Sequence, residues 1–172
     1  IKNIIRRAFF KGHSNSDSYL QYEKKSWAQS GEDIIIEYLF GLRKIVQPSC
    51  LDIGAFDPII SNNTYKFFLK NSRIVNIDAN GAAIEKFEKV RPADTNLNLG
   101  IGGKEGTFDF YIMEDESLNT FSLVENSPLA IFGHRVQEIK KINVVTVNQL
   151  INKYFNSLPP DLISIDAEGV DF

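Results

Sequence analysis

Apolar residues recur at helical spacing in several segments of the chain. The first segment follows Ser30, a favourable N-cap with Asp33 three residues later, and its helix is expected to end at Gly41. Thr146 and Gln149 match a capping box that would open a later helix. Besides the first, the predicted helices cover residues 63–70, 81–90, 135–140 and 147–155.

Short apolar runs alternate with these helices and predict strands. The runs cover residues 50–53, 73–78, 96–101, 142–147 and 162–166. Strands that alternate with helices of about ten residues form βαβ units. We therefore expect an α/β fold with a parallel core sheet and helices on both faces. Residues 107–112 alternate apolar with polar side chains, which predicts an inserted antiparallel strand pair.

Composition narrows the class of protein. The chain has 172 residues, 43% of them apolar and 24% charged, which suits one globular domain. Its net charge of −3 gives no electrostatic reason to expect a nucleic-acid partner. The single cysteine allows no intrachain disulfide and fits a reducing, cytoplasmic compartment. No apolar run is long enough to predict a transmembrane segment.

The beginning of the chain differs from the rest. Residues 1–25 are predicted to be a helical extension that precedes a domain over 26–172. Within residues 1–11, basic and apolar side chains are mixed. A peripheral helix packed on the domain, or a piece of linker, is the favoured interpretation, and contact with a membrane surface is the alternative.

Acidic residues at the ends of the predicted strands are the candidate ligand-binding residues. Parallel strands bring their carboxyl ends to one crevice, where ligands bind, so Asp52, Asp78, Ile101 and Asp166 should line it. Gly54 allows a tight turn and a close approach of a ligand to the backbone. An acid placed like Asp78 binds ribose hydroxyls in dinucleotide folds, although it can also merely cap a helix.

Two cofactors use this geometry, a nicotinamide dinucleotide and S-adenosylmethionine. The dinucleotide fingerprint needs two further glycines, which residues 54–59 lack, and Asp57 would repel a pyrophosphate. No P-loop motif follows a strand. S-adenosylmethionine has no phosphate and is cationic, so an acidic turn suits it better. An oxidoreductase that uses a nicotinamide cofactor, and a non-catalytic nucleotide-binding or interaction module, remain as alternatives.

Seven motifs in a fixed order resemble the FkbM methyltransferase family. They lie at residues 26–33, 52–56, 61–65, 76–80, 98–101, 118–121 and 164–169. The resemblance covers the chain from about Gln29 to its end. It implies a Rossmann-like class I methyltransferase sheet and S-adenosylmethionine-dependent O-methylation of a sugar, glycan or secondary metabolite.

The same resemblance implies roles for individual residues. Asp52, Gly54 and Ala55 would hold the methionine part of the cofactor, and Asp78, Ala79 and Asn80 would bind or flank the ribose. Gly100 and Ile101 would lie near the adenine. The rim of the site would include Gln29, Glu32 and Asp33. Phe56 departs from the wider class I pattern, in which a second glycine often stands there, and it is expected beside the cofactor or in the core.

The candidate catalytic residues are Asp166 and Glu168, which would face the transferred methyl group and the acceptor. The alternative is that Asp166 only orders the cofactor and Glu168 caps a helix. Asn119 and Thr120 would reach the acceptor, or form only a local turn. No cluster of histidine and cysteine predicts a metal site, and His134 is expected at the surface.

The last predicted strand would be an edge with unpaired backbone groups. A class I sheet has more strands than the four core strands predicted here. We therefore expect either that the C-terminal part of the domain is missing from this chain or that a second chain covers the edge and forms a homodimer.

Overall fold

The computed structural model describes residues 22–122 and 135–166. Its central sheet is entirely parallel, in the order β3-β2-β1-β7. The strands of this sheet are β1 (Cys50–Ile53), β2 (Ile74–Asp78), β3 (Thr95–Asn98) and β7 (Leu162–Ile165). The predicted α/β class and the four core strands are therefore confirmed. Of the helical extension predicted over residues 1–25, residues 1–21, with the predicted membrane contact, lie outside the described residues.

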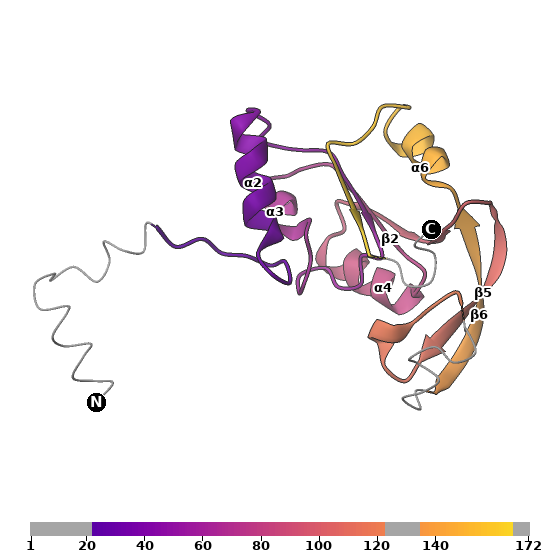
Figure 1. Ribbon diagram of the computed structural model, residues 1–172. Coiled ribbons are helices and arrows are strands. Elements are labelled where there is room, and N and C mark those ends of the chain that lie inside the picture. Colours follow the sequence, from indigo (N-terminus) through magenta and orange to yellow (C-terminus); the bar gives the residue numbers. More distant parts are fainter. Residues whose placement is uncertain (1–21, 123–134, 167–172) are drawn as a thin grey trace, which may run out of the picture.

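Helices cover both faces of the sheet (Figure 1). On one face lie α2 (Glu32–Leu42) and α3 (Tyr65–Phe68), and on the other lies α6 (Val147–Tyr154). Helix α4 (Gly81–Val90) connects β2 to β3 and contacts both strands. Within the described residues, no helix has the length and apolar character that crossing a bilayer requires.

The alternation of side chains along β1 and β2 divides the core in two. Leu51 and Ile53 face α6, where they pack with Leu150 and Phe155. Cys50 faces α3 and packs against its aromatic side chains, as expected for a small buried hydrophobe. The same face also carries a row of polar side chains in register across the four strands, namely Asn96, Asn76, Asp52 and Ser164.

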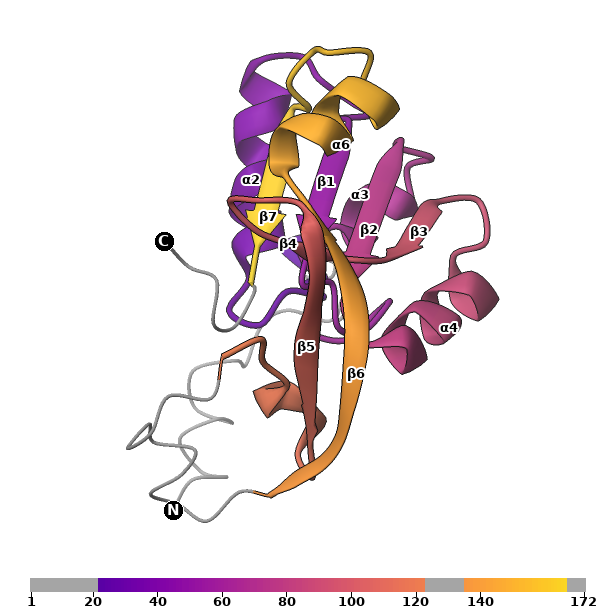
Figure 2. The same cartoon turned by 90° about the vertical axis from the view of Figure 1, so that its right-hand side faces the viewer.

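A second sheet forms a ribbon beside the first (Figure 2). Its strands are β4 (Gly100–Ile101), β5 (Gly106–Met113) and β6 (Val136–Val145), in the order β4-β6-β5. Strands β5 and β6 are antiparallel, which confirms the predicted inserted pair, whereas β4 runs parallel to β6. A short 3-10 helix, η2 (Glu116–Leu118), follows β5 and contacts it.

The predicted helix over 135–140 is wrong. Residues 136–140 belong to β6, whose Ile142 and Val144 are buried while the side chains of 136–141 are exposed. A cross-strand ion pair between Lys141 and Asp109, with 2.6 Å between Nζ and Oδ1, accompanies the pairing with β5. The glutamine, glutamate and lysines here favour a helix locally, but pairing with a distant strand overrides that preference.

The predicted strand over 96–101 is two strands rather than one. Strand β3 ends at Asn98, and the chain then leaves the central sheet, so that β4 joins the second sheet. The Leu99 N–H donates to the Asp78 carbonyl at 3.2 Å, which holds this crossing point against the end of β2. The split brings Gly100 and Ile101 to the boundary between the two sheets.

Two helix starts also differ from the predictions. Helix α2 is capped by Gly31 rather than Ser30, and it continues past Gly41 to Leu42. Helix α3 is much shorter than the predicted 63–70, and its N-cap Thr64 makes no side-chain cap bond. That hydroxyl is engaged elsewhere, as described below. Helix α4 and the capping box of α6 match the predictions.

The α6 cap provides a test of the fold. In Thr146→Ala the Gln149 N–H loses its side-chain acceptor, so we expect the free energy of unfolding to fall by about 1 kcal/mol. Urea denaturation measures this change. Thr146→Ser keeps the hydroxyl and serves as the control; equal stability of the two variants would contradict the capping role.

Candidate functional site

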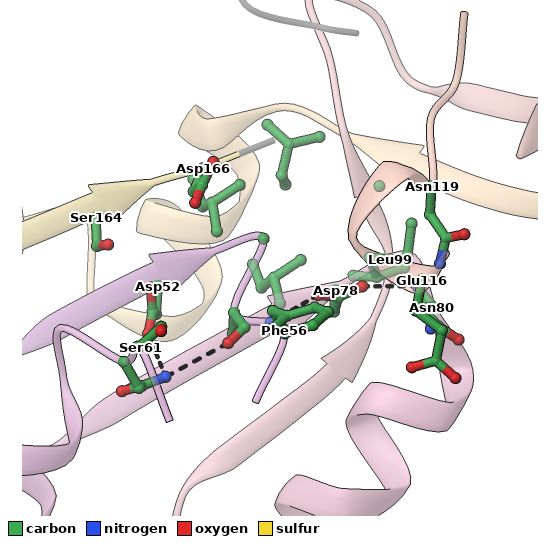
Figure 3. A pocket seen from close by; sticks show the side chains of 18 of the residues that line it. Asp52, Phe56, Ser61, Asp78, Asn80, Leu99, Glu116, Asn119, Ser164 and Asp166 are labelled. Atoms are coloured by element: carbon green, nitrogen blue, oxygen red, sulfur yellow. Dashed lines mark hydrogen bonds between the residues drawn. The ribbon is translucent and has the colours of Figure 1, made fainter. Parts of the chain in front are cut away.

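A cavity of about 320 Å³ opens at the carboxyl ends of β1, β2 and β7, beside β4 (Figure 3). This is where a parallel sheet binds ligands. All residues predicted to bind the cofactor line it, together with Asn119 from the predicted acceptor set. They are Gln29, Asp52, Gly54, Ala55, Phe56, Asp78, Ala79, Asn80, Gly100, Ile101, Asn119 and Asp166.

Other predicted residues do not line the cavity. Asp33 is fully buried and accepts hydrogen bonds from the segment just before α2, and Glu32 caps the backbone of Ser30. Thr120 is buried and forms a bridge with β5 instead. Glu168 and the two histidines lie outside the described residues.

Asp57 lies outside the cavity as well, because its Oδ1 accepts from two backbone N–H groups of its own turn, at 2.8 and 2.9 Å. The expectation that Asp57 supplies acidity to the site is therefore wrong. Trp27 also lies outside the cavity lining and packs edge-on against Tyr65, with 5.3 Å between ring centroids.

The turn after β1 is fastened to the end of β2. The N–H groups of Gly54 and Ala55 both donate to the Ile77 carbonyl, at 2.9 and 3.0 Å. Gly54 has φ 73°, a left-handed conformation that suits glycine, and Phe56 adopts φ 54°. The Phe56 N–H donates to the Asp78 carboxylate. Phe56 places a side chain at a position where many class I turns have glycine.

Asp78 ends β2 and faces the cavity (Figure 3). Its carboxylate accepts from the N–H groups of Phe56, at 2.9 Å, and Asn80, at 2.7 Å. Burial raises the pKa of Asp78, and these two backbone hydrogen bonds act against that shift. Each carboxylate oxygen retains a lone pair for a ligand hydroxyl. Asn98 holds the turn that follows, because its amide donates to the carbonyls of Asp78 and Ala79.

Asp52 lies deeper, with 4% of its surface exposed. Its Oδ2 accepts from the Thr64 hydroxyl at 2.9 Å and from the Asn62 amide at 3.3 Å. Burial raises the pKa of Asp52, whereas the Thr64 hydroxyl and the Arg91 charge lower it. This carboxylate lies in the wall of the cavity and is fixed from behind by the segment that leads into α3.

The sequence analysis missed Arg91, which is fully buried behind Asp52. Its guanidinium forms an ion pair with Asp94 at 2.7 Å and lies between the rings of Phe68 and Phe87, 5.1 Å from each centroid. In the sequence, Arg91 is only a charged residue between a helix and Pro92. No local pattern marks it as buried.

The opposite end of the cavity is apolar. Leu99, Ile101, Phe110 and Phe121 line it. A Cβ on Gly100 would meet the Phe121 ring and would come within 2.9 Å of Val144 Cγ2, so a side chain there would force one of them to move. This close packing explains the need for glycine at the predicted adenine position.

Asn119 contributes an unused donor at this end of the cavity. Its Oδ1 accepts from the Met113 N–H at 2.8 Å, while its Nδ2 is buried and has no partner among the described residues. A buried donor without a partner is costly, and a ligand acceptor in the cavity would satisfy it. Glu116 lies nearby and forms an exposed ion pair with Lys86 at 3.6 Å (Figure 3).

The ionisable side chains that line the cavity are all carboxylates. They are Asp52, Asp78, Glu116 and Asp166, and no lysine, arginine or histidine of the described residues lines the cavity. Across the described ranges, no group of three or more histidine, cysteine and acidic side chains is arranged to hold a metal ion. The site therefore favours a cationic organic ligand over an anionic one.

The parallel sheet with helices on both faces, and its cavity at the strand ends, define a Rossmann-like methyltransferase fold. Residues 52–172 match the Methyltransferase FkbM domain. This match spans more than half of the chain, so the chain belongs to the FkbM methyltransferase family, as its ordered motifs predicted. Neither the curated proteins nor the solved structures include a significant match.

The raised pKa of Asp78 predicts a pH-dependent stability. The folded state binds a proton there more tightly than the unfolded chain does. The resulting stabilisation is complete below the ordinary carboxyl pKa of about 3.9 and is lost as the pH rises through the raised value. The Asp78→Asn variant does not lose stability in this way, because asparagine does not ionise.

We therefore expect the free energy of unfolding of Asp78→Asn, relative to the wild type, to increase between about pH 4 and about pH 7. Urea denaturation at several pH values in that range measures the difference. A difference that does not change with pH would contradict the buried, charge-disfavouring environment of Asp78.

Proposed function

We propose that this methyltransferase takes its methyl group from S-adenosylmethionine and transfers it to a hydroxyl oxygen of a sugar, glycan or secondary metabolite. The observation that carries the proposal is the cavity lining, in which every ionisable side chain is a carboxylate. S-adenosylmethionine has a sulfonium and an ammonium group and no phosphate. Such a cavity attracts this cation and repels the pyrophosphate of a dinucleotide.

The parts of the cofactor match the chemistry of successive walls of the cavity. The Asp78 carboxylate is a suitable acceptor for the ribose hydroxyls, since its oxygens have lone pairs left over. Asp52 offers a buried negative charge for the ammonium group of the methionine part. The apolar end at Leu99 and Ile101, closely packed around Gly100, suits the adenine ring.

Methyl transfer requires alignment of the acceptor oxygen with the methyl carbon and the sulfur. When bound, S-adenosylmethionine supplies a methyl group on a positively charged sulfur. The acceptor oxygen forms a bond to the methyl carbon while the carbon–sulfur bond breaks, and its electron pair goes to sulfur. The hydroxyl proton must pass to a base during this step.

Asp166 is our candidate for that base. It follows β7, is exposed, and lines the cavity, while its backbone N–H donates to the Ile53 carbonyl at 2.9 Å. This hydrogen bond fixes the backbone of Asp166 beside the end of β1, and the exposure of the side chain leaves room for an acceptor hydroxyl. Glu168, two residues later, is the second candidate. The acceptor class itself rests on the family resemblance.

Calorimetric titration tests the cofactor assignment. We expect S-adenosylhomocysteine and S-adenosylmethionine to bind the wild type more tightly than NAD does. Asp78→Ala should weaken both by about ten- to a hundredfold, because hydrogen bonds to a charged group contribute about 1.5–3 kcal/mol. Asp109→Ala removes an exposed carboxylate on β5 and is the control. Tighter binding of NAD, or equal affinities of the two variants, would refute the assignment.

The role of Asp166 is tested by turnover. S-adenosylhomocysteine release is measured with a panel of sugars and hydroxylated metabolites. With an accepted substrate, we expect Asp166→Asn to lower kcat by about a hundredfold or more, a much larger effect than its effect on cofactor affinity. An unchanged kcat would exclude Asp166 as the base. No release with any hydroxyl acceptor, despite cofactor binding, would favour a non-catalytic binding module.

A further inference from the structure

Besides its ion pair with Asp94, Arg91 forms hydrogen bonds with several other residues. Its Nη1 donates to the Asn62 Oδ1 at 3.2 Å, and its Nη2 donates to the Thr64 hydroxyl oxygen at 3.1 Å. It also reaches the Pro58 carbonyl and the amide oxygen of Asn76 in β2. A guanidinium with no exposed surface is thus surrounded by acceptors drawn from three separate segments.

Two of the side chains that Arg91 contacts, Thr64 and Asn62, also donate hydrogen bonds to Asp52. Thr64 Oγ1 accepts from the guanidinium and lies 2.9 Å from Asp52 Oδ2. Because arginine only donates, the Thr64 hydroxyl must use its own proton toward another acceptor. The alternative acceptor, the Asn62 Oδ1, already accepts from Arg91 and from the Thr64 N–H. The proton is therefore directed to the Asp52 carboxylate.

The orientation of the Asn62 amide follows from the same constraint. Its oxygen faces the donors of Arg91 and the Thr64 backbone, so its Nδ2 must face the other way. On that side it meets three acceptors: the Asp52 carboxylate and the carbonyls of Ala55 and Asp57. Arg91 thereby orients two of the donors to Asp52, whereas the third, the Ser164 hydroxyl, does not contact Arg91.

Asp52 is not part of the ion pair in this cluster. Arg91 pairs with Asp94, and no cationic side chain of the described residues is in direct contact with the buried Asp52. Arg91 acts on Asp52 in two ways: its charge lowers the pKa of that carboxyl, and its hydrogen bonds orient Thr64 and Asn62. A cationic group in the cavity would complete the charge balance.

We infer that Arg91 is a positioning residue that acts through Thr64 and Asn62 to aim the Asp52 carboxylate at the ammonium group of the bound methionine part. The inference rests on the proposed function. It separates the roles of the two acids: Asp52, with Arg91 behind it, recognises the amino acid part, whereas Asp78 recognises the nucleoside.

A conservative pair of variants at Thr64 tests this relay. Thr64→Val removes the hydroxyl with little change in shape, and Thr64→Ser retains it. Two ligands are titrated by calorimetry: S-adenosylhomocysteine, and 5′-methylthioadenosine, which keeps the nucleoside and thioether but has no amino acid group. We expect Thr64→Val to bind S-adenosylhomocysteine about tenfold more weakly, with unchanged affinity for 5′-methylthioadenosine. Thr64→Ser should match the wild type for both ligands.

Several results would overturn the inference. Equal weakening of both ligands in Thr64→Val would indicate a general structural defect, and no weakening of either would show that Asp52 does not depend on the relay. Arg91→Met should show the same ligand selectivity if it folds, as judged by thermal unfolding. If the wild type binds neither ligand, the proposed function itself is wrong. If the wild type binds both ligands but the variants do not weaken S-adenosylhomocysteine selectively over 5′-methylthioadenosine, only the relay is refuted.

The pH profile gives a second readout that a merely structural role would not change. Hydrogen bonding by Thr64 favours the ionised form of Asp52, so its loss should raise the pKa of that carboxyl further. S-adenosylhomocysteine affinity of Thr64→Val should then decline at a higher pH than that of the wild type as the solution is acidified. An identical profile would contradict the relay. The other charged groups around Asp52 are Arg91, Asp94, Asp78 and Asp166, and all four are the same in the wild type and in Thr64→Val.

Discussion

Burying a guanidinium costs several kcal/mol unless its donors find acceptors in good geometry. Arg91 meets this condition by drawing together the loop before α3, the polar row of the central sheet and its own neighbour Asp94. The loop that carries Asn62 and Thr64 has almost no regular structure of its own, since α3 is a single short turn. Arg91 therefore helps to hold this loop, and with it the back wall of the cavity, beside the hydrogen bonds that Asn62 makes to Trp27, Ala55 and Asp57.

The register of the sheet determines what Arg91 can reach. Asp52 and Asn76 are partners on adjacent strands and point to the same face, opposite to the apolar residues that pack under α6. A shift of one residue in either strand would turn these side chains into the apolar core. The fold and the site are therefore specified together: the alternation that buries Leu51 and Ile53 also presents Asp52 to the relay.

What the sequence could predict follows from the range of each interaction. The strand over Cys50–Ile53, helix α4 and the capping box at Thr146 depend on residues only a few positions apart, and all were predicted. The site residues at strand ends were predicted for another reason, because a parallel sheet brings the carboxyl ends of its strands together. The first part of β6, residues 136–140, was not, since its polar residues form a strand only through pairing with β5. Arg91 was missed because its acceptors come from other segments.

The carboxyl groups of Asp52 and Asp78 lie in surroundings that disfavour their ionised forms. Burial raises the pKa of both Asp52 and Asp78, and the charge of Asp52 raises that of Asp78 further. Without a ligand, the ionised site therefore costs free energy of folding. A cation that binds only the folded state offsets this cost and adds its own linkage to stability. A pyrophosphate would increase the same repulsion, so the groups that weaken the empty fold also favour a cationic ligand over an anionic one.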